Sequence, residues 1–282
     1  MENNIIFSNN NCNNSLYNEK NQTITIENCN DTLYFIFDNY IPSSLNLEIS
    51  NSNVTILEIF KGNIPKCEYT INIPNNSSLN RLSIFVDTTS SIDINRIVNN
   101  HGFYKSMQLD LNNENVISNE NINMLQENAN ALIFDGIYAT NNSVKKYQTN
   151  IIHIAKSCKS EAKIFAINNE KAHVSIYTDA YIKAGATSTN TTQEGRIINL
   201  SNTCSGIVLP NLHIDENDVL ASHSCSVGSV NKDHLYYLES RGFTEKQAKN
   251  ILILGYFNPL LKNINDEQIK ENISNILKAR IS

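Results

Sequence analysis

The chain has 282 residues, with 22 basic and 28 acidic side chains and a net charge of −6. This acidic balance argues against a nucleic-acid partner, which requires a basic surface, and it favours a cytoplasmic protein. No apolar run approaches the roughly 20 residues that span a bilayer, and the polar N-terminal stretch lacks the pattern of a signal peptide, so we expect no membrane partner.

Residues 1–22 are rich in asparagine and contain few apolar anchors, so we expect a loose arm or one irregular strand there. From Thr23 the chain consists of short runs rich in β-branched and aromatic residues, separated by Asn, Asp, Ser, Gly or Pro. In "SLNLEIS", Leu45, Leu47 and Ile49 alternate with polar residues, which is the period of a half-buried strand. This pattern continues to Val230 and predicts a mainly β core over residues 23–230.

The arrangement of these strands has two solutions. Many short strands joined by tight turns fit either a pair of packed sheets or a β-solenoid. No strict sequence period chooses between them, and only "NENINMLQENANA" has a weak helical pattern within the β region.

The pattern becomes helical over residues 231–282. Asn231 is suited to begin a helix as its N-cap, and Gly242 is suited to end it in the left-handed conformation. Thr244 and Gln247 have the spacing of a capping box for a second helix, which we expect Pro259 to end. A third helix follows near the C-terminus.

The second and third predicted helices each carry an apolar stripe. The second has Ala248, Ile251, Leu252 and Gly255 on one face. The third has its own set at helical spacing, namely Ile269, Ile273, Ile276 and Leu277. We expect the helical region to pack its apolar stripes against the β core.

The junction between the β core and the helices carries a dense motif within Pro210–Phe257. Its matching residues are Pro210, Leu212, Ile214, Asp218, Val219, Ser222, His223, Gly228, Leu235, Tyr237, Leu238, Ser240, Arg241, Gly242, Glu245, Ala248, Gly255 and Phe257. This block resembles the C-terminal signature of the SufB/SufD family of iron–sulfur cluster assembly proteins. A weaker resemblance extends upstream to about Ile151 and includes His153 and Gln193.

The resemblance implies a right-handed parallel β-helix followed by a C-terminal helical domain. It also implies a scaffold and not an enzyme. Such a protein pairs with a second copy or another SufB/SufD-type subunit through the β-helix, docks a SufC-type ABC ATPase on its terminal helices, and holds an iron–sulfur cluster transiently. The residues expected to bind the partner are Leu235, Tyr237, Arg241, Gly242, Tyr256 and Phe257.

Three departures separate the chain from the SufB-type pattern. The chain is shorter than the usual SufB or SufD, and we expect it to lack their helical N-terminal region. Ser224 stands where SufB-type proteins have Glu after the histidine, and Gly195 stands where they have a cysteine. The resemblance is therefore to a compact, SufD-like member.

His223 and Cys225 are the candidate cluster or metal ligands. Two residues apart on an extended strand, they point to the same face. Imidazole and thiolate suit iron or zinc, but a stable site needs three or four ligands, so a paired chain would have to complete it. His213 could approach if solenoid rungs stack. The alternative is a structural role, with His223 hydrogen-bonded and Cys225 a small buried apolar residue.

Two other functions remain open on sequence grounds. A β-solenoid enzyme acting on carbohydrates is disfavoured because the chain has no tryptophan for a sugar platform and no recognisable hydrolase motif. A structural paralogue that binds the ATPase without carrying a cluster is compatible with Ser224 and Gly195.

Overall fold

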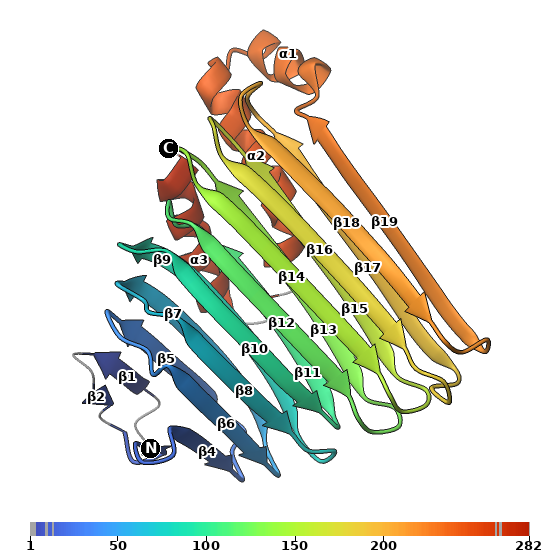
Figure 1. Cartoon of the computed structure of the whole chain (residues 1–282). Helices are drawn as coiled ribbons and strands as arrows, with labels where there is room; N and C mark the ends of the chain where they lie inside the picture. Colours follow the sequence, from blue (N-terminus) through green and yellow to red (C-terminus); the bar gives the residue numbers. More distant parts are fainter. Residues whose placement is uncertain (1–3, 9–10, 13, 263, 265–266, 282) are drawn as a thin grey trace.

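The protein is a parallel β-solenoid with a short helical region at its C-terminal end (Figure 1). The computed structural model describes residues 4–8, 11–12, 14–262, 264 and 267–281. The chain alternates between two facing sheets, so that each turn of the solenoid, here called a rung, contributes one strand to each sheet. This confirms the mainly β fold and selects the solenoid over the pair of packed sheets.

Two sheets of nearly equal size form the solenoid. The ten-stranded sheet contains, in spatial order, β19 (Val219–Ser229), β17 (Thr189–Asn199), β15 (Lys159–Asn168), β13 (Asn130–Ala139), β11 (Phe103–Asp110), β9 (Ser78–Thr88), β7 (Asn53–Gly62), β5 (Thr32–Asp38), β1 (Asn4–Ser8) and β2 (Asn11–Cys12). The nine-stranded sheet contains β18 (Ser205–Ile214), β16 (His173–Ile182), β14 (Val144–His153), β12 (Val116–Met124), β10 (Ile92–Asn100), β8 (Cys67–Ile73), β6 (Ser44–Ser50), β4 (Thr23–Glu27) and β3 (Tyr17–Asn18).

The period of two in the sequence places one face of every strand inside the solenoid. In-register parallel pairing then stacks equivalent side chains from rung to rung. Phe7, Phe37, Phe60 and Phe85 form such a ladder, with successive ring centroids 4.9, 4.6 and 5.0 Å apart. Phe7 belongs to β1, so part of segment 1–22 is paired with the solenoid. The division of the chain at residues 22 and 230 stays a prediction.

Asparagine serves the solenoid in two ways. Tight corners need the left-handed backbone conformation, which Asn tolerates better than most residues, and Asn39 and Asn141 adopt it with φ of 57° and 58°. On the outer face of the nine-stranded sheet, Asn side chains on successive rungs bond to one another. The Asn99 amide donates to Asn72 at 2.7 Å, and the Asn123 amide donates to Asn99 at 3.0 Å.

Three helices follow the last strand: α1 (Lys232–Ser240), α2 (Glu245–Leu261) and α3 (Glu267–Ile281). The predicted caps are confirmed, because Asn231 accepts from the N–H of Asp233 at 2.8 Å and Thr244 forms a capping box with Gln247. Gly242 has φ of 94°, as predicted for the residue after a helix. The predicted end of the second helix at Pro259 is wrong. Pro259 lies inside α2, whose last turn continues because Leu260 and Leu261 pack against other apolar side chains.

Helices α2 and α3 cover the outer face of the ten-stranded sheet (Figure 1). The sheet contributes Leu57, Leu82, Ile84, Met107, Leu109, Leu111, Phe134, Tyr138 and Ile167 to this second core. The helices and the segment between them contribute Ile253, Phe257, Leu260, Leu261, Ile264, Ile269, Ile273, Leu277 and Ile281. Among the described helices, none is long and apolar enough to cross a membrane.

Only part of the apolar stripe expected on α2 is buried in the structure. Ala248 is buried as predicted, but Ile251 is 39% exposed and Gly255 faces open space. The residues that pack against the sheet are instead Ile253 and Phe257, followed by the last turn. The sequence "ILILGYF" is apolar on several faces, so its spacing does not specify which face the sheet will cover.

Candidate functional site

The solenoid ends at its C-terminal side in an uncapped rung. Among the described strands, β18 is paired only with β16, and β19 only with β17, so each keeps one free edge. Several apolar side chains on these two strands are exposed: Ile207, Leu209, Ile214, Leu220 and Val227. We call the free edges and interior face of β18 and β19 the open end. Such an edge is a ready template for another strand.

His223 and Cys225 lie on the interior side of the open end. β19 pairs in register with β17, so that His223 is opposite Gln193 and Cys225 is opposite Gly195. Gln193 is buried inside the solenoid, and side chains opposite each other in a parallel ladder share a face. The two candidate ligands therefore point inward, about 7 Å apart along the strand. Both remain exposed because no described strand covers this rung.

The rung beneath the candidate ligands is shaped by a glycine. A Cβ atom at Gly195 would collide with Cγ1 of Val208, which points inward from β18. The space beside Gly195 inside the solenoid is thus occupied by the Val208 side chain of the nine-stranded sheet. Cys225 lies opposite Gly195 on the neighbouring strand β19, and its thiol is exposed.

A single chain does not assemble a complete metal site at the open end. Among the described residues, no group of three or more His, Cys, Asp or Glu side chains is arranged to hold a metal ion. The expected approach of His213 is wrong. His213 lies on the outer face of the nine-stranded sheet, stacked on Tyr181 at 4.3 Å, with Nε2 3.1 Å from the Asp179 carboxylate.

The solenoid interior holds a charged cluster that the sequence analysis missed. Arg81 donates to Glu58 at 3.2 Å, to Glu120 at 3.0 Å and to the Tyr104 hydroxyl at 2.9 Å, and all four side chains are buried. Arg96 is also fully buried, and burial lowers its pKa. A signal was present, since Arg96 is in phase with Ile92, Ile94 and Val98 along β10.

Two further buried groups titrate abnormally. Asp135 accepts from the N–H of Gln108 at 3.1 Å, and burial, together with Glu120, raises its pKa to about 7. His153, which the resemblance included, is buried with Nε2 3.0 Å from the Ser160 hydroxyl, and burial lowers its pKa to about 4. Asp135 and His153 are both buried, as is the cluster around Arg81, so we assign these groups a structural role.

The residues expected to bind a partner fall into two groups. Tyr237 is 56% exposed, and the Arg241 guanidinium lies 5.2 Å from its ring centre. Leu235 and Tyr256 are half-buried. Phe257, in contrast, is 2% exposed and packs into the core between α2 and the sheet. None of the nine residues of α1 is buried. The neighbouring Tyr236 and Phe243, which were not predicted, are exposed as well.

Comparison with known proteins identifies a family model that covers most of the chain and relatives that match parts of it. A family model described as "SUF system FeS cluster assembly, SufBD core domain" matches residues 50–256. The iron–sulfur cluster assembly protein SufD of Bacillus subtilis is 30% identical over 165 residues, which cover 56% of this chain and 38% of that protein.

Shorter matches involve other members of the same group. A SufBD family protein of Mycobacterium leprae is 32% identical over 103 residues, covering 36% of this chain and 26% of that protein. The SufD protein of Escherichia coli is 31% identical over 64 residues, covering 23% of this chain and 15% of that protein. The matches thus span well under half of the length of each of these relatives.

Proposed function

The chain belongs to the SufBD core family of the SUF iron–sulfur cluster assembly system, and we propose that it is a scaffold subunit of such a system. In this role it pairs through the open end with a second copy or with a SufB/SufD-type subunit. It docks a SufC-type ABC ATPase on its C-terminal helices. It carries an iron–sulfur cluster transiently as cargo and has no catalytic activity of its own.

The open end is the observation that carries this proposal. Strands β18 and β19 present unpaired backbone N–H and C=O groups along one edge each, next to exposed Ile214 and Val227. A second chain that adds strands here satisfies these hydrogen bonds and covers the apolar interior at the same time. A symmetric pair would bring the same surface of both copies together.

Pairing would also complete the candidate ligand set. One chain offers His223 and Cys225 on the interior side of the open end. A two-fold pair offers two imidazoles and two thiolates, which is the number and the type of ligands that iron–sulfur clusters and iron use. The cluster would then lie between subunits and could be released when the pair opens.

The exposed helical hairpin supports docking of an ATPase. Tyr236 and Tyr237 on α1 are 73% and 56% exposed, and Phe243 follows in the turn before α2. Arg241 lies against Tyr237. Tyr and Arg are the residue types that contribute most to binding energy at protein interfaces.

Co-purification tests the partner part of the proposal. The full chain, co-expressed with the SufC-type ATPase of the same genome, should retain that ATPase on an affinity column. Tyr237→Asp should reduce capture at least tenfold, because it places a charge in the aromatic patch. Tyr177→Asp, on the outer face of the nine-stranded sheet, is the matched control and should capture normally. Failure of the unaltered chain to retain the ATPase would reject the docking role.

Metal analysis tests the cargo part. Protein purified without oxygen, alone and with the ATPase, should contain iron and acid-labile sulfide, and His223→Ala should lower both. The alternative, a structural paralogue without a cluster, predicts capture of the ATPase together with iron at background level in every sample.

A further inference from the structure

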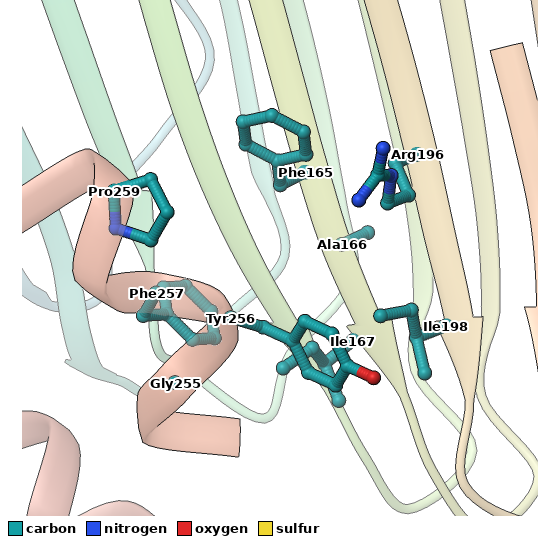
Figure 2. A pocket seen from close by; sticks show the side chains of 9 residues that line it. All are labelled: Phe165, Ala166, Ile167, Arg196, Ile198, Gly255, Tyr256, Phe257 and Pro259. Atoms are coloured by element: carbon teal, nitrogen blue, oxygen red, sulfur yellow. The ribbon is translucent and has the colours of Figure 1, made fainter. Parts of the chain in front are cut away.

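A hollow lies between α2 and the outer face of the ten-stranded sheet, away from the open end's interior (Figure 2). Its cavity volume is about 100 Å³, and it is partly open to solvent. Its sheet side is formed by Phe165 and Ile167 of β15 and by Arg196 and Ile198 of β17, which are opposite each other in register. Its helix side is formed by the α2 segment around Tyr256.

Beside the hollow, side chains of α2 pack closely on the sheet. At Gly136 on β13, a Cβ atom would come within 2.7 Å of Leu260 and 2.8 Å of Phe257, so the helix touches the backbone there.

The outermost strand leaves the hollow accessible. On β19, Ser226 lies opposite Arg196 and Gly228 lies opposite Ile198, so the strand adds only small residues at this edge. A Cβ atom at Gly228 would meet nothing within 4 Å. A small molecule can therefore reach the hollow without moving the helix.

The lining combines apolar surface with one cation. Figure 2 shows the Phe165 ring and the Tyr256 ring on opposite sides of the hollow and the Arg196 guanidinium beside Phe165. The guanidinium carbon lies 5.9 Å from the centre of the Phe165 ring. Its Nη2 atom is 3.3 Å from Glu194, and the Arg196 side chain is half exposed, so further N–H donors remain for a ligand. Lys163 and Glu161, paired with each other on β15, are the other charges nearby along the neighbouring strand.

We propose that this hollow binds a small aromatic carboxylate, with its ring between the apolar walls and its carboxylate on Arg196. Arginine binds carboxylates with two parallel hydrogen bonds, and mostly apolar walls with one polar anchor are typical of small-molecule sites. The site is separate from the scaffold role, since none of its side chains is a candidate cluster ligand. Its failure would leave that role untouched.

Isothermal titration of the full chain with 1-naphthoate tests the proposal, and 1-naphthalenemethanol is the uncharged probe with the same ring system. Naphthoate should bind with a stoichiometry of one per chain, and the alcohol should bind at least tenfold more weakly. Arg196→Gln should weaken naphthoate binding at least tenfold and should bring the two probes to similar affinity.

Two further variants locate the site. Tyr256→Ala removes the ring on the helix side of the hollow and should weaken naphthoate binding at least tenfold, with thermal unfolding as the check that the protein is intact. Lys183→Gln, which removes a cation 5.5 Å from the Tyr181 ring on the other sheet, should bind naphthoate normally. No saturable binding of naphthoate at millimolar concentration, equal binding of the alcohol, or unchanged binding in Tyr256→Ala would each overturn the proposal.

Discussion

Arg81 and Arg96 are fully buried in a solenoid interior otherwise lined largely with Ile, Leu and Phe. Arg81 is tolerated because its guanidinium is bonded to two carboxylates and a tyrosine hydroxyl. A buried charge network of this kind gives little net stability, yet it becomes costly once one partner is removed. Its side chains come from several rungs, so it also penalises a shift in register between them.

Replacing Arg81 by methionine should therefore be strongly destabilising. The variant leaves Glu58 and Glu120 buried without their cation, and we expect the free energy of unfolding to fall by about 3–5 kcal/mol. Urea unfolding followed by circular dichroism measures the change. Lys61→Met breaks an exposed ion pair with Asp38 and is the matched control, with an expected effect below about 1 kcal/mol. Equal effects of the two variants would contradict a structural role of the cluster.

Asp135 should make stability depend on pH in the direction opposite to most carboxyls. Its pKa is about 7 in the folded protein and near 4 in an unfolded chain, so the folded state holds the proton more tightly. The stabilising contribution is complete below about pH 4 and is lost as the pH rises to about 7. Asp135→Asn should thus match the unaltered protein at pH 4 and be more stable by about 1–3 kcal/mol at pH 8.

The comparison must be made between the two proteins at each pH. His153 has a folded-state pKa of about 4, below its unfolded value of about 6.5, so its contribution to stability rises over the same window. This contribution is common to both proteins and cancels in their difference. A difference that stays constant from pH 4 to pH 8 in urea unfolding would show that Asp135 does not titrate in this range.

At the scale of elements, the contact between α2 and the ten-stranded sheet depends on Gly136. Gly136→Ala would place a Cβ atom 2.7–2.9 Å from the side chains of Leu260, Phe257 and Leu109. Crowding of this kind costs about 1–3 kcal/mol, and we expect it to loosen α2 and α3 before the solenoid. Hydrogen exchange should show faster exchange in both helices and unchanged protection in β13 and its neighbours.

Gly228→Ala provides the control for this prediction. Gly228 is also a strand glycine of the same sheet, but a Cβ atom there meets nothing within 4 Å. Its hydrogen-exchange pattern should equal that of the unaltered protein. Unchanged exchange of the helices in Gly136→Ala would contradict the close contact as the anchor of the helical region.

The elements were predictable from the sequence to the extent that local physical chemistry decides them. The period of two located the strands, and the caps at Asn231 and Thr244 were read directly from short-range hydrogen bonding. Rung stacking depends on contacts between residues about 25–30 positions apart, such as Phe60 with Phe85. The sequence has no strict repeat of this length that would have predicted the stacking. Only the family resemblance indicated the solenoid.

The candidate site was predictable in part for the same reason. The shared face of His223 and Cys225 follows from strand geometry, and register with Gln193 now assigns that face to the interior. His213 lies on the outer face because of how β18 pairs with β16. Local residue spacing does not contain this information about strand pairing. The pocket at Arg196 lies between α2 and the sheet, so it depends on tertiary packing that local spacing does not contain.

At the scale of the whole molecule, the C-terminal end of the described solenoid is uncovered, and the proposed pairing would cover it. Strands β18 and β19 have 10 and 11 residues, so each free edge is roughly 33–37 Å long. Along these edges Val227 is 47% exposed although it lies opposite the fully buried Ile197 of the rung below. The proposed pairing with a second chain would cover this interior position.

Sedimentation velocity should therefore find a dimer of the unaltered chain at micromolar concentration. Val227→Lys places a charge in the covered interior of the pair, and we expect its dissociation constant to rise at least tenfold without loss of the fold, because Val227 is already exposed in the single chain. Ile117→Lys alters an apolar side chain of similar exposure on the outer face of β12 and should leave the dimer intact. A monomeric unaltered chain would contradict self-pairing. A pair formed at this edge would bury the lysine of Val227→Lys without a partner, which is energetically costly. A dimer that survives this substitution would therefore place the interface elsewhere.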